Sequence, residues 1–337
     1  MTRSIASLCI SFAVAVGTVG CFPASDVPAR QGEVDQFRAG VPRTDTVTMS
    51  VPGSASSGQA LTVETQSQAL LGDTAEWYQT TRAVTATVNG GALAVGGLVN
   101  LIIKYPPTSI AQDEAVWGPW EDTLDPVAWK VTITRVAEHE YQYKFEGRPR
   151  TDPTAAFVIV LSGTHTPALN AQGREIERFG RGSFTLDWDA RATLPQPDGN
   201  VGKADYRYEH MGAAAAVSIT AQFRQVKDDK NPGNRIDASY AFAQQPGGPG
   251  SMDFVLTTPT TASQSGGRGV VRSRWQFSGA GRADVQVKAT DGTTFAVSEC
   301  WDENYASVYK EASWPVGNGW GDESSCIFPT ADYSTLQ

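Results

Sequence analysis

The three histidines are the first candidates for chemistry, because imidazole is a common general base and a common zinc ligand. His139 stands between Glu138 and Glu140 in a stretch that predicts a turn, and the chain contains no HExxH zinc motif. His165 follows a Ser-Gly-Thr stretch that lacks the Gly-x-Ser-x-Gly pattern of serine hydrolases, and His210 lies in no motif. The surroundings of the three histidines therefore predict polar turns and loops, without catalysis or metal binding.

Acidic residues offer a second chemistry, since two carboxylates that face a sugar can hydrolyse a glycosidic bond. Asp187 and Asp189 alternate with apolar residues between positions 184 and 188, which predicts both carboxylates on one face of a strand. A solvated strand face explains the same alternation. We assign no catalytic residue from this pattern.

One loop carries several of the oxygen ligands that Ca²⁺ prefers. The candidate ligands are Asp228, Asp229, Asn231 and Asn234. The loop lacks the ligand spacing of a calcium-binding loop and its terminal glutamate. The sequence therefore predicts no metal site and no cofactor.

Aromatic and basic side chains near turns are candidates for a binding surface. The tryptophans concerned are Trp117, Trp120, Trp301, Trp314 and Trp320, and the arginines are Arg268, Arg272, Arg274 and Arg282. Tryptophans can stack on sugars, and the arginines near Trp275 could meet an anionic lipid or polysaccharide. Core packing and pairing with acidic side chains are the alternative interpretations.

The N-terminal residues predict export. Arg3 supplies a positive charge, and the apolar stretch from Ile10 to Val19 is too short to span a bilayer. The sequence from Thr18 to Cys21, Thr-Val-Gly-Cys, resembles the lipobox of bacterial lipoproteins. That resemblance implies cleavage before Cys21 and a membrane anchor of acyl chains, such as palmitate, on this cysteine.

One residue departs from the lipobox pattern, and another gives a cue about the membrane to which the protein is sorted. Thr18 stands where the family prefers leucine, which leaves a secreted or periplasmic protein as the alternative. Phe22 rather than Asp follows the cysteine, and this resembles the lipoproteins that are sorted to the outer membrane.

Cysteine arithmetic predicts one disulfide. Cys9 is removed with the signal and Cys21 carries the lipid, so Cys300 and Cys326 remain as a pair. In an oxidising compartment a bond between them stabilises the fold by roughly 3 kcal/mol. Two cysteines without a nearby histidine are too few for a zinc site.

Composition limits the function classes. A chain of 337 residues with a net charge of -9 lacks the clustered Lys and Arg that general nucleic-acid binding needs. Many Gly, Thr, Ser and Ala residues and few charges favour strands and turns over long surface helices. Nucleic acid is therefore excluded as a partner, and an all-β fold is the first expectation.

The chain is predicted to have three parts: a signal peptide over 1–20, a lipid-anchored flexible tether over 21–58, and a single β-rich domain over 59–337. Prolines recur through the second part, at Pro23, Pro28, Pro42 and Pro52, with almost no apolar periodicity. Such a tether lets a globular domain stand off a membrane surface, and a partly packed segment is the alternative.

One long helix is predicted over 73–104, begun by a cap at Asp73 or Thr74 and ended by Pro106-Pro107. Its apolar stripe comprises Trp77, Val84, Val88, Val95, Val99 and Ile102. A second, more polar stripe comprises Arg82, Thr85, Asn89, Gly96 and Asn100. This amphipathic pattern predicts packing on a sheet, and the two asparagines and the glycine pairs oppose the alternative of a membrane-spanning helix.

After Pro126 the chain alternates apolar and polar residues between turn signals, as antiparallel strands do. Trp129, Val131 and Ile133 are expected to face one way, and a hairpin turn near 137–140 leads into the next strand. The predicted fold is mainly β: a large curved antiparallel sheet, or a partly closed barrel, covered by the amphipathic helix. This layout resembles lipoprotein carriers only in architecture.

Two stretches give a broader resemblance. Residues 180–189 and residues 273–284 look like uncharacterised lipoproteins of Gram-negative bacteria. The resemblance covers about the C-terminal half of the chain and implies no activity.

The expected function is therefore that of an exported cell-envelope lipoprotein, on the outer membrane, whose β domain binds an amphiphile, a glycan or an envelope protein without catalysis. The alternative is a carboxylate-dependent hydrolase that acts on envelope polysaccharide. Close carboxylates in a cleft favour the hydrolase, whereas an apolar groove between sheet and helix favours a carrier.

Overall fold

The computed structural model describes residues 31–53, 71–120, 125–228, 233–258, 267–313 and 319–336. Compact packing divides them into two units. Unit 1 holds the described residues of 47–91 and those from 204 onward, and unit 2 holds those up to 46 and those of 92–203. The sequence predicts one domain over 59–337, because its strand pattern continues through residue 203 without a change of composition.

Helices are few. They are α1 (Gln31–Ala39), the 3-10 helix η1 (Thr44–Thr46), α2 (Glu76–Ile102), α3 (Trp188–Arg191) and the 3-10 helix η2 (Glu323–Ser325). Helix α2 fulfils the prediction of one long helix over 73–104. Its N-terminal part belongs to unit 1 and its C-terminal part to unit 2.

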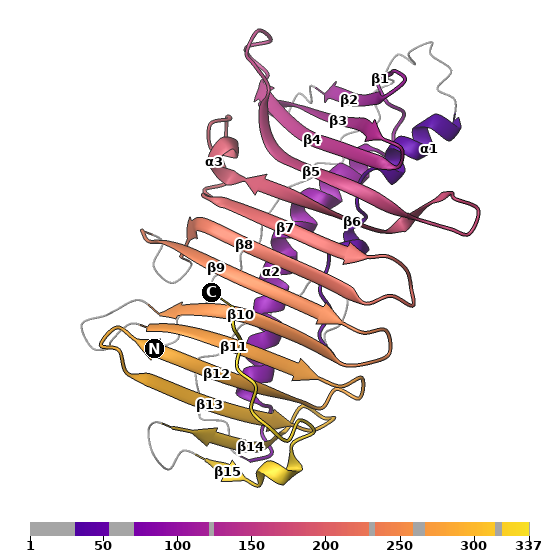
Figure 1. Ribbon diagram of the computed structural model, residues 1–337. Coiled ribbons are helices and arrows are strands. Elements are labelled where there is room, and N and C mark those ends of the chain that lie inside the picture. Colours follow the sequence, from indigo (N-terminus) through magenta and orange to yellow (C-terminus); the bar gives the residue numbers. More distant parts are fainter. Residues whose placement is uncertain are drawn as a thin grey trace. The chain divides into compact units, whose positions relative to one another are not determined.

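The strands are antiparallel and follow one another in sequence order within each unit (Figure 1). Unit 2 contains β1 (Ser109–Ile110), β2 (Glu114–Trp120), β3 (Val127–Ala137), β4 (Glu140–Pro149), β5 (Val158–Leu169) and β6 (Glu175–Asp187). Unit 1 contains β7 (Lys203–His210), β8 (Val217–Lys227), β9 (Arg235–Gln244), β10 (Gly250–Thr258), β11 (Gly267–Trp275), β12 (Gly281–Ala289), β13 (Thr294–Trp301), β14 (Ser307–Ala312) and β15 (Trp320–Gly321). The mainly β, antiparallel fold class is confirmed. In the described residues the first and last strands of a unit do not pair, so each sheet is open.

The β3–β4 hairpin shows why alternation predicted the strands so well. Val131 pairs with Phe145 and Ile133 with Tyr143, and all four side chains are buried. Their neighbours in sequence point to the other face and are more exposed. Burying one row of apolar side chains fixes the register, because a slip of one residue would expose the whole row.

In unit 1, helix α2 crosses the strands instead of running along one of them. Hydrogen bonds join successive turns of the helix to four strands: Trp77 to Glu299 of β13, Thr81 to Ser273 of β11, Thr85 to Met252 of β10 and Val88 to Tyr206 of β7. Val88 is 1% exposed at this interface. The helix therefore covers the inner face of the sheet of unit 1, as predicted.

The polar stripe of α2 is not a solvent face. The Asn89 side chain accepts a hydrogen bond from Met49 N and donates one to Met49 O, both at 2.8 Å, so it imitates one rung of a β-ladder. In unit 2 the Asn100 amide donates to Pro42 O at 3.1 Å. Both asparagines thus bind backbone that precedes the helix in the sequence.

Residues 31–53 lie within the segment predicted as a tether over 21–58, and they are packed, as the alternative of a partly packed segment expects. Their buried side chains are Val34, Phe37, Ala39, Val41, Val47, Met49 and Val51. Apolar side chains between the prolines are buried, and the backbone beside them binds the polar stripe of α2, which is why this part of the segment is packed. Residues 21–30 and 54–58 lie outside the described part.

Among the described residues, no helix combines the length and the apolar character that crossing a membrane requires.

We predict that Val88→Asp lowers the free energy of unfolding of unit 1 by roughly 3 kcal/mol or more, because it buries a charge without a partner. The matched control is Thr87→Asp, in the same turn but exposed, which should change stability by less than about 0.5 kcal/mol. Urea denaturation followed by tryptophan fluorescence measures both variants. Equal stability of the two variants would contradict packing of this side of α2.

Candidate functional site

A polar cavity of about 490 Å³ lies in unit 2, and we call it the turn pocket. Its lining residues are Gln36, Asp113, Arg135, Val136, Ala137, Glu138, His139, Tyr141 and Glu175. Two turns and one strand end bring them together: the β1–β2 turn, the β3–β4 turn and the start of β6, with α1 beside them. Its site residues are therefore spread over more than a hundred positions of sequence.

His139 lies in the β3–β4 turn and lines this pocket. His139 has a φ of 57°, in the left-handed region that few residues other than glycine adopt. Its ring Nδ1 lies 2.7 Å from Glu175 Oε1, and its Nε2 lies 3.7 Å from Glu138 Oε1. The short contact with Glu175 fixes the orientation of the ring, whereas the Glu138 carboxylate is too distant for a hydrogen bond.

Glu175 is the central acceptor of the turn pocket. Its Oε1 also accepts a hydrogen bond of 2.8 Å from the Tyr141 hydroxyl, while its Oε2 is buried and has no hydrogen-bond partner among the described residues. The Glu175 side chain is only 10% exposed. Burial, and then the bond to Glu175, raise the pKa of Tyr141, so its hydroxyl stays a donor.

Charge in the turn pocket is unbalanced toward negative. Arg135 is its single guanidinium, and it is bound to Asp113 at 3.1 Å and to Gln112 O at 2.5 Å. Its guanidinium also lies 5.9 Å from the centre of the Phe37 ring. In the part of the chain that the structure describes, neither Glu138 nor Glu175 pairs with a lysine or an arginine, so the pocket can attract donors and cations.

No group of three or more acidic, cysteine or histidine side chains suited to a metal ion occurs within the described ranges. Of the proposed calcium ligands, Asp229 and Asn231 lie outside those ranges. Asp228 is buried.

The other two histidines do not join the turn pocket. His165 is 1% exposed on β5, where burial lowers its pKa to about 4, and it stays neutral near neutral pH. Its ring fills the space that a side chain at Gly180 would need. His165 is therefore a core residue and not the polar loop residue that was expected, and His210 ends β7.

The acidic pair Asp187 and Asp189 does not share a strand face. Strand β6 ends at Asp187, whose side chain caps helix α3 by accepting from Ala190 N. Asp189 lies inside α3 and accepts from Gly202 N at 2.9 Å. Both carboxylates are occupied by local structure, so the strand prediction fails after residue 187 because the capping preference of Asp wins.

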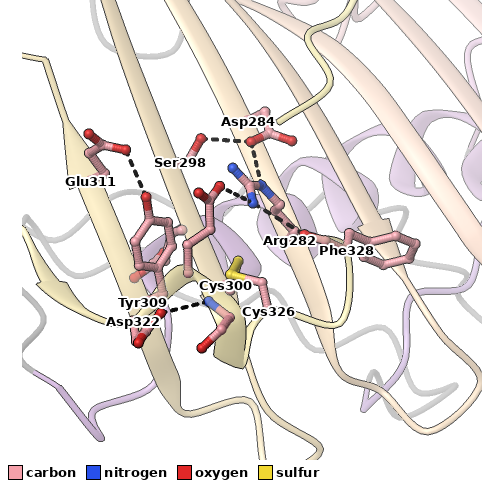
Figure 2. Close-up of a disulfide and its surroundings, with 12 residues drawn as sticks. Arg282, Asp284, Ser298, Cys300, Tyr309, Glu311, Asp322, Cys326 and Phe328 are labelled. Carbon is pink, nitrogen blue, oxygen red and sulfur yellow. Dashed lines mark hydrogen bonds and ion pairs between the residues drawn. A yellow bond between two sulfur atoms is a disulfide. The ribbon is translucent and has the colours of Figure 1, made fainter. Parts of the chain in front are cut away.

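The predicted disulfide is present in unit 1 (Figure 2). Cys300 on β13 and Cys326, directly after η2, have Cα atoms 5.5 Å apart and an S–S bond of 2.07 Å. Tyr309 of β14 and Val308 pack against the bond. It lies on the outer face of the sheet, the face that α2 does not cover.

The arginines of β11 and β12 form an ion-pair network on the same outer face. Asp284, fully buried, accepts from Arg282 Nε at 2.8 Å, from Arg274 Nη2 at 2.7 Å and from Ser298 Oγ at 2.7 Å. Arg272 makes two bonds to Asp253, at 2.9 and 3.0 Å. Pairing with acidic side chains, the alternative interpretation of the sequence, is therefore the observed arrangement.

Some of the candidate tryptophans are buried in the core, and others are partly exposed at the surface. Trp117 and Trp301 are fully buried, so they serve packing. Trp120 in β2 and Trp320 in β15 are partly exposed. Trp314 lies outside the described residues. None of them lines the turn pocket.

Cys21, the predicted lipid anchor, also lies outside the described residues, as does the whole signal peptide that the sequence predicts over 1–20. The turn pocket itself was not predicted. His139 between two glutamates was the one signal for it in the sequence, and Tyr141 was assigned to a strand.

The fold, the turn pocket and the disulfide region together describe a mainly β protein that is built from open antiparallel sheet. No protein-family model matches the chain, and searches of curated proteins and of solved structures found no similar protein.

We predict that Cys326→Ser lowers the free energy of unfolding of unit 1 by roughly 3 to 4 kcal/mol, the chain-entropy value for a bond that spans 26 positions. Urea denaturation of the variant and of the oxidised wild type measures it. Thiol labelling after unfolding without reductant provides the control and should detect no Cys300 or Cys326 thiol in the wild type. Two labelled thiols from this pair would contradict the bond.

Proposed function

We propose that the chain is an exported cell-envelope lipoprotein, anchored to the outer membrane by acyl chains on Cys21, that binds a ligand without transforming it. The signal-like N-terminus and the lipobox resemblance support export and anchoring in the cell envelope. The disulfide supports it too, because such bonds persist in oxidising compartments. A secreted or periplasmic protein is the alternative.

Of the three ligand classes considered, we propose a glycan, and the turn pocket carries this choice. Sugars present many hydroxyl groups in a fixed arrangement, and they are bound by planar polar side chains such as carboxylate, imidazole and amide. The turn pocket offers all three, in Glu175, His139 and Gln36. An amphiphile would need an apolar lining, which the described residues of this pocket do not provide.

The negative balance of the turn pocket favours a sugar that carries an amine. No described residue donates to Glu175 Oε2, and each charge-assisted bond to a buried carboxylate contributes about 1.5–3 kcal/mol. An amino sugar supplies an ammonium group for this carboxylate and hydroxyl groups for its neighbours.

Hydrolysis is the second candidate, because Glu138 and Glu175 stand on either side of His139. Two catalytic carboxylates must both face the sugar, whereas Glu175 Oε1 is already bound to His139 and Tyr141 and the Glu138 side chain is 92% exposed. Binding is therefore the better-supported proposal.

For the turn pocket we expect a chitosan oligosaccharide, which carries free amines, to bind more tightly than its N-acetylated counterpart or an oligogalacturonate. Glu175→Gln should weaken chitosan binding about tenfold, because it removes the charge that faces the amine. The matched control is Glu311→Gln in unit 1, since Glu311 also accepts a hydrogen bond from a tyrosine hydroxyl.

Calorimetric titration measures the affinities, and release of reducing ends is followed in the same samples. Equal binding of the three sugars, or no loss on Glu175→Gln, contradicts the amine site. Reducing ends that appear with the wild type and not with Glu175→Gln would establish the hydrolase instead.

The anchor is tested separately. Cys21→Ser should move the protein from the membrane fraction to the soluble fraction, because it removes the sulfur that carries the lipid. Metabolic labelling with a fatty-acid analogue should mark the wild type alone. Unchanged fractionation and labelling would contradict the anchor without affecting the sugar proposal.

A further inference from the structure

The last described residues, 327–336, form an irregular segment that we call the C-terminal arm. It follows Cys326 and lies on the outer face of the sheet of unit 1, against β11 and β12. No backbone-to-backbone hydrogen bond of the described residues joins the C-terminal arm to the sheet. Side chains of the sheet hold it instead.

Four arginines of the sheet, which we call the arginine row, hold the arm along its length. Arg282 donates to Phe328 O at 3.2 Å, Arg274 to Thr330 O at 2.9 Å, Arg272 to Asp332 Oδ2 at 2.8 Å and Arg268 to Leu336 O at 3.3 Å. The Phe328 ring lies 4.9 Å from the Arg274 guanidinium, in a cation–π contact. Figure 2 shows Phe328 on the far side of Arg282 from the disulfide.

Three of the four arginines are organised without the arm, whereas the bond given for Arg268 is to Leu336 O of the arm itself. Asp253 holds Arg272 with two bonds, and Asp284 holds both Arg274 and Arg282. These carboxylates belong to β10 and β12, so removal of the arm leaves these guanidinium groups in place. Such a preorganised row loses little conformational entropy when it binds a chain.

The C-terminal arm does not use every donor of the row. Arg274 Nε is buried and has no hydrogen-bond partner in the part of the chain that the structure describes. The Nη1 atom of Arg274 lies 3.8 Å from Asp332 Oδ2, and the Asp332 side chain is 47% exposed. The arm is therefore an imperfect occupant, and an acidic segment placed closer to Arg274 can form more bonds.

From this we infer that the arginine row is a docking surface for an extended acidic segment of a partner protein, and that the C-terminal arm occupies it in cis. The recognised features are an aromatic ring on Arg274 and a carboxylate four residues later on Arg272, the pattern that Phe328 and Asp332 present. Carboxylate–guanidinium pairing supplies charge complementarity, and bonds to backbone carbonyls favour an extended chain.

The test separates the arm from its surface after folding. A protease site is inserted between Ile327 and Phe328, the purified oxidised protein is cut, and the arm is washed away at about 0.5 M salt, where exposed ion pairs are screened. A fluorescent peptide of residues 328–337 is then titrated at about 0.05 M salt by fluorescence anisotropy. The cut protein should bind the peptide, and the uncut protein should bind it at least about tenfold more weakly, because the tethered arm competes at about millimolar effective concentration.

The control peptide carries Asp332→Asn and should bind the cut protein about fivefold more weakly, the loss of one partly exposed ion pair. If the cleavage variant does not fold, the full chain with Asp332→Asn replaces it and should bind the wild-type peptide better than the wild-type chain does. Failure of the folded, disulfide-bonded cut protein to bind at about 1 mM peptide overturns the inference. Equal affinity for the two peptides, or equal binding by cut and uncut protein, overturns it as well.

Discussion

The structure of unit 1 depends on one buried carboxylate. Glu299, on β13, is fully buried, and it accepts hydrogen bonds from Trp77 N at the start of α2 and from Ser307 Oγ at the start of β14. Burial raises the pKa of Glu299, and the free N–H groups of a helix start offset part of that cost. The helix is thus capped by the sheet that it covers, and Lys310 on β14 pairs with Glu76 beside it at 2.8 Å.

The elements that local pattern controls were predictable from sequence. The β3–β4 hairpin followed from alternation, α2 from a stripe of apolar residues, and the disulfide from counting the cysteines that remain after export. The capping residue of α2 was not predictable in this way. Asp73 and Thr74 satisfy the local rule for a cap, but their backbone pairs with the chain near Ala306, and the acceptor comes from Glu299.

Long-range polar contacts explain most of what the sequence did not reveal. Asn89 belongs to the more polar stripe of the helix, and its amide holds Met49, a pairing that is invisible when each segment is considered alone. The turn pocket has the same origin, since Glu175 and His139 stand in different turns. Residues that meet only through the fold carry no periodicity, whereas apolar rows do.

The cap on α2 has a consequence for the order of events during synthesis. Trp77 and its acceptor Glu299 are 222 positions apart, and Ser273 and Met252, which meet the next turns, are also made late. Contacts between distant parts of a chain form slowly, because the intervening chain must first be confined. The ribosome will have finished nearly the whole protein before this helix can acquire its native neighbours, and until then its apolar stripe is an exposed surface on which a chaperone can act.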